Sequence, residues 1–505
     1  MGNQSDAVMS GVVDSGRECG HGNIDANDPN QISPAVVESL DVPSFELIAG
    51  PDGLSLSFSD RAPLRRDEVA GMEEMKMSES NAALTRRTAL AALGAGLAVS
   101  SLTSESSGAA PAVPAPAPDV APKGLFFANP TFHFETLRNA GYIVSNCADL
   151  GEMFETVKGI AEGDPQSWYT AWEATAERAL ALAERTREPV SKGGSYMRAS
   201  TYQRMAEFLL PPDDPKRSAS LEKISSSFFK GLDTLGVRYE ALSVPYGDGR
   251  LRALYFPGPQ RAEGKPLIMF GGGFDSILEE YYPNIAEAAL KRGYSVLIYE
   301  GPGQGEALRK YGLTYTFQWE KPVGAVLDEF LRAHAKPAKI VLIGMSMGGY
   351  FAPRAAAFEE RIDGVVAYDT CYDFGEVASR VISTAKNPEA LKNIGVSWAY
   401  NNARWTMGTK GIEDTIEACA AYTLAPIADR IRQDVLILQG TEDHFIPSHQ
   451  TADFEKALVN ARSVTTRIFD RESGGAGHCQ PGALTLYHAA VFDWLLERFP
   501  ARSTG

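Results

Sequence analysis

A glycine-flanked serine at the end of an apolar run constrains the fold of this chain most. Residues 340–343 (Ile-Val-Leu-Ile) lead into Gly-Met-Ser-Met-Gly-Gly at 344–349, and a helix-type stretch follows at 350–358. Glycines on both sides of Ser346 permit the sharp, strained turn between a strand and a helix that lifts a serine hydroxyl clear of a sheet. This context predicts a nucleophilic Ser346. The alternative is a serine that only caps a helix.

A serine hydroxyl becomes a good nucleophile only when an imidazole removes its proton and a carboxylate orients that imidazole. Both residues are predicted downstream. Asp443 follows the apolar run 435–438 in the loop Gly-Thr-Glu-Asp-His, and His478 lies in a glycine-rich loop before the last helical stretch. The chain order of Ser346, Asp443 and His478 is that of the α/β-hydrolases.

Other residues near these positions are alternatives for the same roles. His444 is the alternative base. It directly follows Asp443, which already occupies the acid position, so we expect His444 to have a surface or loop-packing role. Glu442 is the alternative acid. His334 and His488 fall within helical runs, where a structural role is expected.

Acyl-transfer chemistry also needs backbone N–H groups aimed at the developing oxyanion. Met347, directly after the nucleophile, supplies one. The turn at 271–275 (Gly-Gly-Gly-Phe-Asp) follows an apolar strand and supplies the other, from Phe274 or alternatively Gly273. A phosphate-binding loop is the competing interpretation of this turn, but the Lys-Ser/Thr pair that such a loop requires is missing.

An additional acid would serve a reaction that expels a carbon leaving group. The candidates are Glu300, Asp275 and Glu376. Helix capping or loop hydrogen bonding is an equally good interpretation of each.

Short apolar runs alternate with helical stretches after Gly236. This alternation predicts an α/β fold with a mostly parallel sheet and helices on both faces. Residues 236–505 are assigned to this catalytic domain, and the long helical stretch at about 371–430 between two strands is predicted to be a lid insertion. The predicted strands are 239–244, 251–256, 267–270, 296–299, 340–343, 365–367, 435–438 and 466–469, the first two joined by a hairpin turn.

Residues 124–235 show helical periodicity, and we assign them to an N-terminal helical cap domain. Trp168, Trp172 and three alanines fall on one helix face at spacings of three and four. Together with Trp398 and Trp405 of the lid, these tryptophans could form aromatic walls of a covered pocket, although core packing is the better interpretation for Trp168 and Trp172.

The first part of the chain is predicted to carry a targeting signal; the alternative is a low-complexity, Ala-rich linker that contains an Arg-Arg pair by chance. Residues 1–76 lack periodicity and are predicted to be a disordered tail or an over-extended start. At 77–109, Arg86-Arg87 precedes an uncharged run and a small-residue cleavage site, as in a twin-arginine export signal, and a Pro/Ala linker follows at 110–123. A translation start at Met77 would place the arginine pair close to the amino terminus, where a twin-arginine motif normally lies. We therefore expect a periplasmic or secreted protein if the signal functions, and otherwise a cytoplasmic one.

Composition excludes several classes of partner and cofactor. With 48 Lys and Arg against 64 Asp and Glu, the net charge of −16 disfavours nucleic acid. Five scattered cysteines and seven histidines show no zinc-ligand or disulfide-framework spacing, so no metal site is predicted. The apolar run in the signal is too short and too diluted for a stable membrane span. The sequence leaves a homodimer open.

Seven stretches of the chain together resemble a known family. They are SWYTAW (167–172), RASTYQRMAEFLLPPDDPKR (198–217), GGGFDS (271–276), YEGPGQGE (299–306), GMSMGGY (344–350), GTEDHFIP (440–447) and GAGHCQ (475–480). They resemble the α/β-hydrolases that include 2,6-dihydropseudooxynicotine hydrolase and the fungal pigment hydrolases that shorten polyketides. The similarity covers about 126–499.

The resemblance implies cofactor-free hydrolysis of a carbon-carbon bond in a 1,3-dicarbonyl compound by Ser346, Asp443 and His478. The expected partner is a small-molecule carbonyl substrate. The motifs leave open a carboxylesterase, an aminopeptidase or acyltransferase, and a non-catalytic binding protein with the same fold. The export signal differs from what a cytosolic catabolic enzyme would carry.

Overall fold

The computed structural model describes residues 46–50, 53–57, 125–259 and 264–500. The predicted export signal and linker lie outside the described residues. The described residues divide into two units, one with 46–50 and 53–57 and the other with 125–259 and 264–500. In the first unit, β1 (Glu46–Gly50) and β2 (Gly53–Ser57) pair as an antiparallel hairpin that the sequence pattern did not predict.

An eight-stranded sheet organises the second unit, in the order β10-β9-β8-β7-β5-β6-β4-β3. Only β4 runs against its neighbours; the other pairs are parallel. The mostly parallel α/β fold is thus confirmed. The strands are β3 (Glu240–Tyr246), β4 (Gly249–Phe256), β5 (Leu267–Gly271), β6 (Val296–Tyr299), β7 (Ile340–Met345), β8 (Gly364–Tyr368), β9 (Asp434–Gly440) and β10 (Ser463–Phe469).

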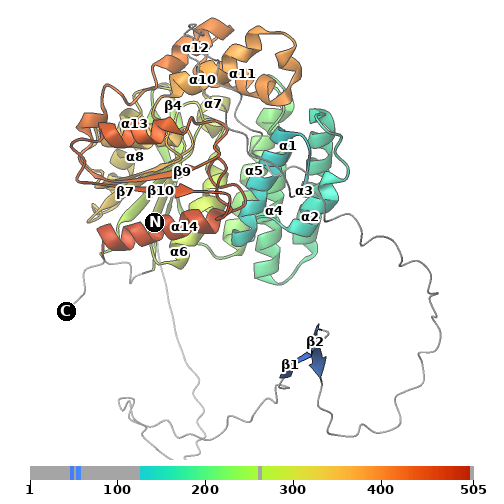
Figure 1. The fold of residues 1–505 in the computed structure, drawn as a ribbon. Helices are drawn as coiled ribbons and strands as arrows, with labels where there is room; N and C mark the ends of the chain where they lie inside the picture. Colours follow the sequence, from blue (N-terminus) through green and yellow to red (C-terminus); the bar gives the residue numbers. More distant parts are fainter. Residues whose placement is uncertain (1–45, 51–52, 58–124, 260–263, 501–505) are drawn as a thin grey trace, which may run out of the picture. The chain divides into compact units, whose positions relative to one another are not determined.

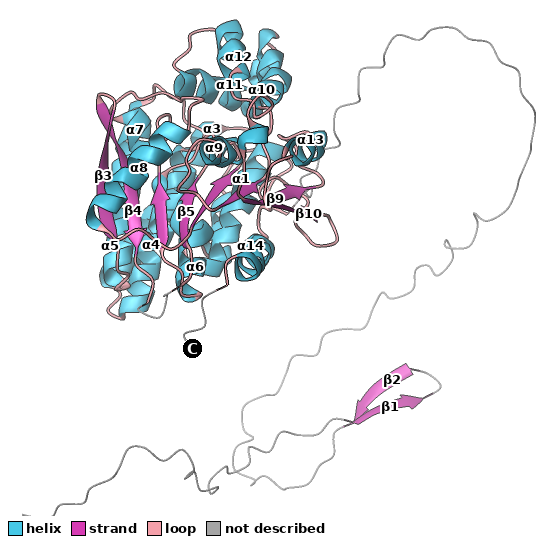
Figure 2. Ribbon diagram, turned by 90° about the vertical axis from the view of Figure 1, so that its left-hand side faces the viewer, coloured by secondary structure: helices cyan, strands magenta, loops and turns pink. Residues whose placement is uncertain are grey.

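Alternate residues of the central strands enter two different cores. On β5, Ile268 and Phe270 pack into one hydrophobic cluster, whereas Leu267 and Met269 pack into another. A strand buried on both faces requires this continuous apolar run, because its side chains point alternately to opposite sides. Helices therefore cover both faces of the sheet (Figure 2).

The helices fall into two groups, one in each hydrophobic core. α6 and α14 share a core with α1–α5, whereas α8, α9, α13 and the insertion helices α10–α12 share the other core. Figure 1 shows α10–α12 grouped apart from α1–α5. The helices are α1 (Pro130–Ala140), α2 (Leu150–Val157), α3 (Pro165–Arg185), α4 (Pro189–Glu207), α5 (Pro215–Thr234), α6 (Glu287–Lys291), α7 (Gly305–Arg309), α8 (Glu320–Ala333), α9 (Gly348–Ala356), α10 (Phe374–Ile382), α11 (Ile394–Met407), α12 (Ile412–Ala420), α13 (His449–Ala457) and α14 (Leu484–Arg498).

Four of the first five helices begin with the same two-residue signal, a capping side chain followed by proline. The cap accepts hydrogen bonds from the first free N–H groups, and proline at the next position already has the helical φ angle. The pairs are Asn129-Pro130, Asp164-Pro165, Glu188-Pro189 and Asp214-Pro215.

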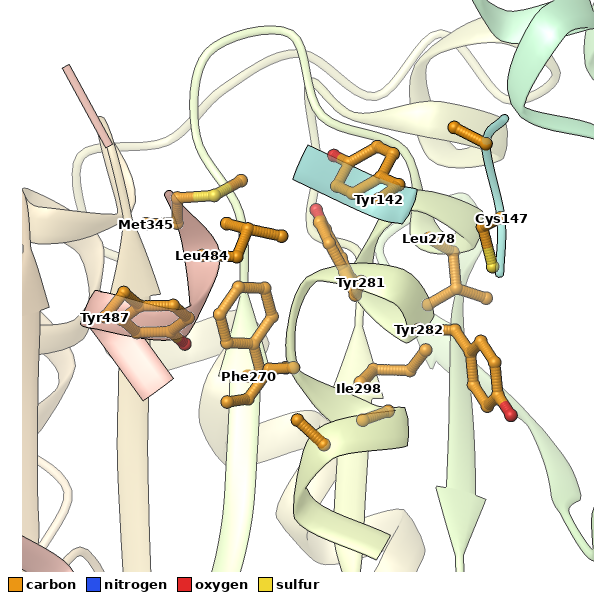
Figure 3. Packing of buried hydrophobic residues seen from close by; sticks show 14 of the residues in the cluster. Tyr142, Cys147, Phe270, Leu278, Tyr281, Tyr282, Ile298, Met345, Leu484 and Tyr487 are labelled. Atoms are coloured by element: carbon orange, nitrogen blue, oxygen red, sulfur yellow. The ribbon is translucent and has the colours of Figure 1, made fainter. Parts of the chain in front are cut away.

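The helices α1–α5 pack on the sheet through aromatic residues. Trp168 and Trp172 are fully buried, as the core interpretation predicted. Beyond α1, the short helix η1 (Gly141–Ser145) carries Tyr142, which lies near Tyr281 and Leu484 above Phe270 of β5 (Figure 3). α1 is thereby held beside the carboxyl ends of the strands. The domain boundaries drawn from the sequence remain predictions.

No helix among the described residues is long and apolar enough to cross a membrane.

Candidate active site

Ser346 lies in a strained turn between β7 and α9. Its φ angle is +61°, a left-handed conformation that is rare for a residue with a side chain and that concentrates at functional sites. The Ser346 N–H donates to the Tyr368 carbonyl at 2.6 Å, and the Ser346 carbonyl accepts from the Gly349 N–H at 2.7 Å. A Cβ at Gly349 would collide with the backbone carbonyl of Asp369, which explains the glycine there.

His478 bridges the serine to a carboxylate. Its Nε2 lies 2.9 Å from Ser346 Oγ, and its Nδ1 lies 2.6 Å from Asp443 Oδ2. Asp443 Oδ1 accepts from the N–H groups of Phe445 and Ile446 at 2.8 and 2.9 Å, which fixes the carboxylate in its loop. The structure thus brings the three predicted residues together in a continuous line.

Burial and charge act in opposition on this pair. Burial lowers the pKa of His478, but the Asp443 carboxylate more than offsets this effect and raises the pKa well above its usual range. Burial raises the pKa of Asp443, but the His478 imidazole outweighs it and lowers that pKa. Asp443 therefore stabilises the imidazolium that forms when His478 takes a proton from Ser346.

A second buried carboxylate, Asp369, lies beside His478, and the sequence analysis missed it. Asp369 Oδ2 is 3.4 Å from His478 Nδ1 and also accepts the Cys479 N–H. Burial and the Asp443 charge raise the pKa of Asp369 to about 8. Asp369 directly follows β8, so it shares the sheet edge that carries Ser346 and Asp443. That placement was the available sequence signal.

The two predicted oxyanion donors flank Ser346. A Cβ on Gly273 would lie 2.8 Å from both the Met347 nitrogen and Ser346 Cβ, so the 271–275 turn touches the nucleophile. The Gly273 N–H already donates to Ser276 Oγ at 2.9 Å, which favours Phe274 over Gly273 as the second donor. Tyr315 and Gln304 hydrogen-bond the Gly273 carbonyl and hold this turn in place.

Ser346 and His478 open into a pocket of about 110 Å³. Its walls come from α1, the turn after β5, the insertion helices α10 and α11, and the two loops that carry Asp443 and His478. The predicted oxyanion residues Phe274 and Met347 also line it. The apolar wall comprises Phe134, Phe374, Val377, Ala378, Val381, Ile382, Trp398, Ala399, Phe445 and Ile446.

The four tryptophans considered from the sequence divide by position. Trp398 lines the pocket and stacks on Phe208 with ring centroids 5.0 Å apart. Trp405 instead lies beside Arg217 and Arg309 and is outside the pocket lining, as are Trp168 and Trp172.

The three auxiliary acids predicted from the sequence also lie in different places. Asp275 lines the pocket, where burial raises its pKa but Arg138 and Arg204 outweigh burial and lower it. Glu300 is outside the lining; it accepts from Arg252 at 2.9 Å and from two N–H groups that begin α7. Glu376, likewise outside it, accepts from Gln450 at 2.7 Å.

Glu135 of α1 is an acid in the pocket that sequence reasoning missed. It is 4% exposed, and its Oε2 accepts from Arg138 at 3.2 Å. Burial raises the pKa of Glu135 to about 8, although Arg138 opposes the shift. The spacing within α1 carries no motif for such a residue.

The remaining rivals have other contacts. His444 is exposed and packs its ring on Phe134, with ring centroids 4.8 Å apart. Glu442 pairs with Arg471 at the surface. His478 is the imidazole that contacts both Ser346 Oγ and Asp443 Oδ2.

One group of potential metal ligands occurs among the described residues: Asp369, His478 and Cys479. His478 Nδ1 already faces Asp443, and burial raises the pKa of Cys479 to about 11. A thiol of that pKa does not supply the thiolate that a metal prefers. The donor set suits proton transfer better than metal binding.

Strand order, the strained serine turn and the serine-histidine-aspartate line define the class of protein. Residues 268–493 match the model of the alpha/beta hydrolase family. The chain belongs to the α/β-hydrolase family and is a hydrolase by homology.

Similar proteins from fungi match most of the chain. Hydrolase acrC of Aspergillus aculeatus is 32% identical over 422 residues, covering 74% of this chain and 98% of its own. The 20-hydroxy-prefusarin hydrolase of Gibberella moniliformis is also 32% identical, covering 74% of this chain and 97% of its own.

A similar solved structure is that of 2,6-dihydroxy-pseudo-oxynicotine hydrolase. Its TM-score is 0.55 at 21% identity, and the match covers 72% of this chain and 96% of that one. This likeness supports the fold.

Proposed function

We propose that the protein is a serine-dependent hydrolase that cleaves a carbon-carbon bond in a small 1,3-dicarbonyl compound of polyketide-like or aromatic character. The observation that carries the proposal is the line from Asp443 through His478 to Ser346, which opens into a covered, mostly apolar pocket. The relative named for its action on 20-hydroxy-prefusarin supports a substrate of natural-product type.

The first half of the reaction forms an acyl-enzyme. Ser346 Oγ adds to a substrate carbonyl carbon while His478 Nε2 takes the hydroxyl proton. The N–H groups of Phe274 and Met347 hold the oxyanion. The adduct collapses by breaking the carbon-carbon bond, whose electron pair leaves as an enolate. Protonated His478 then gives its proton to the enolate carbon, which releases a ketone.

The second half uses the same residues on water. His478 takes a proton from water, the hydroxide oxygen adds to the acyl carbon, and the bond to Ser346 Oγ breaks. The serine oxygen recovers a proton from His478, and a carboxylic acid leaves. The sum is one water consumed for one carbon-carbon bond cleaved, with no oxidant and no cofactor.

Carboxylester hydrolysis is the second candidate, because the same three residues and two N–H donors suffice for it. The pocket disfavours a peptidase, since a space of about 110 Å³ under two coverings suits a compact molecule rather than a folded polypeptide. The export signal predicted at 77–109 supports a further proposal, that the enzyme acts outside the cytoplasm.

The test compares kcat/KM for an aryl 1,3-diketone, a matched aryl ester and an aminoacyl anilide under one condition, with Ser346→Ala as the control. We expect the diketone to be cleaved and the anilide to be poor. Preference for the anilide would overturn the proposal, and ester hydrolysis without diketone cleavage would move the enzyme to the carboxylesterases.

A further inference from the structure

The two ends of the pocket differ in chemistry. Side chains of α10, including Val377, Val381 and Ile382, form an apolar part of the lining, called the apolar end below. At the other end, α1 contributes Glu135 and Arg138, and these meet residues from the turn after β5 and from the segment that follows it. The polar end is defined here as Glu135, Arg138, Tyr142, Asp275, Ser276 and Asn284.

The polar end lies next to the reacting groups. Asp275 belongs to the turn whose Gly273 touches Ser346, and Asp275 Oδ2 accepts from Arg138 at 2.9 Å. On the other side, Phe134, which precedes Glu135 on α1, packs its ring against His478 with centroids 6.4 Å apart. α1 is thus held against the predicted nucleophile and base at once.

Among the acids around Arg138, Glu135 has the weakest ion pairing. Arg138 of α1 pairs with Glu280 at 2.8 Å and with Asp275 at 2.9 Å, and with Glu135 only at 3.2 Å. Arg204 of α4 adds positive charge but pairs with Asp275 and Glu280, not with Glu135.

The pKa of Glu135 follows from these neighbours. Burial raises it to about 8, Asp275 and Glu280 act in the same direction, and Arg138 and Arg204 oppose them. Below that pH the carboxyl group is neutral and can donate a hydrogen bond.

Asn284 supplies an independent indication that this end receives a polar ligand. It is 3% exposed and lines the pocket, and its Nδ2 contacts the Met345 sulfur at 3.4 Å. Its Oδ1 has no hydrogen-bond partner among the described residues. A buried amide oxygen without a partner is costly, so Asn284 is a polar group of this end that the protein alone leaves unsatisfied.

We propose that the polar end binds the second oxygen of a 1,3-dicarbonyl substrate and that Glu135 donates a hydrogen bond to it, while the apolar end holds the acyl substituent. This inference rests on the proposed function and names which half of the substrate lies where. When the carbon-carbon bond breaks, its electron pair moves toward that second oxygen. A neutral donor there stabilises the enolate. An ester has no such oxygen in its leaving group.

The experiment measures kcat/KM from about pH 6 to about pH 10 for an aryl 2,2-dimethyl-1,3-diketone and a matched aryl ester. The two methyl groups remove the acidic C–H of the substrate, so any pH dependence belongs to the enzyme. For the wild type, cleavage of the diketone should fall as pH rises through about 8 relative to the ester, because Glu135 loses its proton there.

Two substitutions at Glu135 separate donation from shape. Glu135→Leu should lower kcat/KM for the diketone about tenfold or more below pH 8 and leave the ester nearly unchanged. Glu135→Gln keeps a neutral donor, so it should remain active and lose the fall above pH 8. The matched control is Glu280→Gln, which removes another partner of Arg138 that lies outside this pocket. This variant should keep the fall in diketone cleavage at high pH, but the fall should occur at a lower pH.

Binding gives a readout that does not depend on turnover. In the Ser346→Ala background, Glu135→Leu should weaken binding of the diketone about tenfold. The inference would be overturned if Glu135→Leu lowered kcat/KM equally for the diketone and the ester, or if Glu135→Gln kept the wild-type pH profile. Both outcomes presuppose that the wild type cleaves the diketone. A wild type that cleaves only the ester would instead overturn the proposed function, and unchanged diketone binding in the Ser346→Ala background would overturn the subsite separately.

Discussion

Replacing Asp443 by asparagine tests how the second carboxylate acts at the site. In the worked serine-protease triad, the equivalent change costs on the order of 10⁴-fold in kcat, because the amide stabilises the wrong imidazole tautomer. Here Asp369 Oδ2 remains 3.4 Å from His478 Nδ1 after the substitution. The Asp443 charge helps to raise the pKa of Asp369, so its removal should lower that pKa and leave a carboxylate beside the imidazole.

The distances set the expected magnitude. At an effective dielectric constant of about 20, an imidazolium gains about 6.4 kcal/mol from a carboxylate at 2.6 Å and about 4.9 kcal/mol from one at 3.4 Å. The difference is worth roughly tenfold, and the lost direct hydrogen bond roughly another tenfold. We therefore expect Asp443→Asn to lower kcat by on the order of 10²-fold rather than 10⁴-fold.

The assay is a double-mutant cycle on kcat, with Asp369→Asn as the second substitution and thermal unfolding as a check on folding. Asp369→Asn alone should cost a few fold, since Asp443 keeps the shorter contact, whereas adding it to Asp443→Asn should bring the loss to on the order of 10⁴-fold. If Asp369→Asn has no additional effect in the Asp443→Asn background, the backup role of Asp369 is refuted.

Three other expectations concern the nucleophile, a buried acid and targeting. Ser346→Ala should abolish both turnover and labelling by a fluorophosphonate, with the melting temperature retained; intact mass and calorimetry check this. Burial raises the pKa of Glu207, but three arginines outweigh it and lower the pKa to about 2. Its contribution to stability is therefore complete above the unfolded pKa of about 4.3 and is lost as pH falls toward 2. Glu207→Gln should lower the free energy of unfolding by about 3–5 kcal/mol near neutral pH. Urea titrations should also show that the stability of this variant depends less on acid pH than that of the wild type. Started at Met77, the protein should be exported by a host with a twin-arginine pathway, and replacement of Arg86 and Arg87 by lysine should retain it inside; fractionation decides.

The sequence was sufficient to predict the site residues that lie in short, recognisable motifs. Ser346 has a strand before it and glycines beside it, and the loops of Asp443 and His478 follow strands in the expected order. Each depends on local backbone geometry, so local patterns were sufficient to place these residues at one sheet edge.

Glu135 and Asp369 could not be assigned in this way, because their properties come from neighbours distant in the chain. On α1, Glu135 is an ordinary helix residue in sequence, and its raised pKa comes from burial and from the charges of Asp275 and Glu280. Asp369 gains its raised pKa from burial and from Asp443, in the loop after the neighbouring strand β9. Conversely, Glu300 looked suitable beside a glycine-rich turn, but Arg252 and the start of α7 use its oxygens.

The origin of the pocket walls indicates how substrate choice is divided in this enzyme. The reacting groups lie on loops at the sheet edge, the apolar end comes from the insertion between β8 and β9, and the polar end depends on α1 from the helices that precede the sheet. Because Arg138 ties α1 to Asp275, a shift of α1 would move the turn that carries the Phe274 N–H. In the proposed reaction, recognition of the second oxygen and stabilisation of the oxyanion would therefore be mechanically linked, whereas the acyl end could vary with the insertion between β8 and β9 alone.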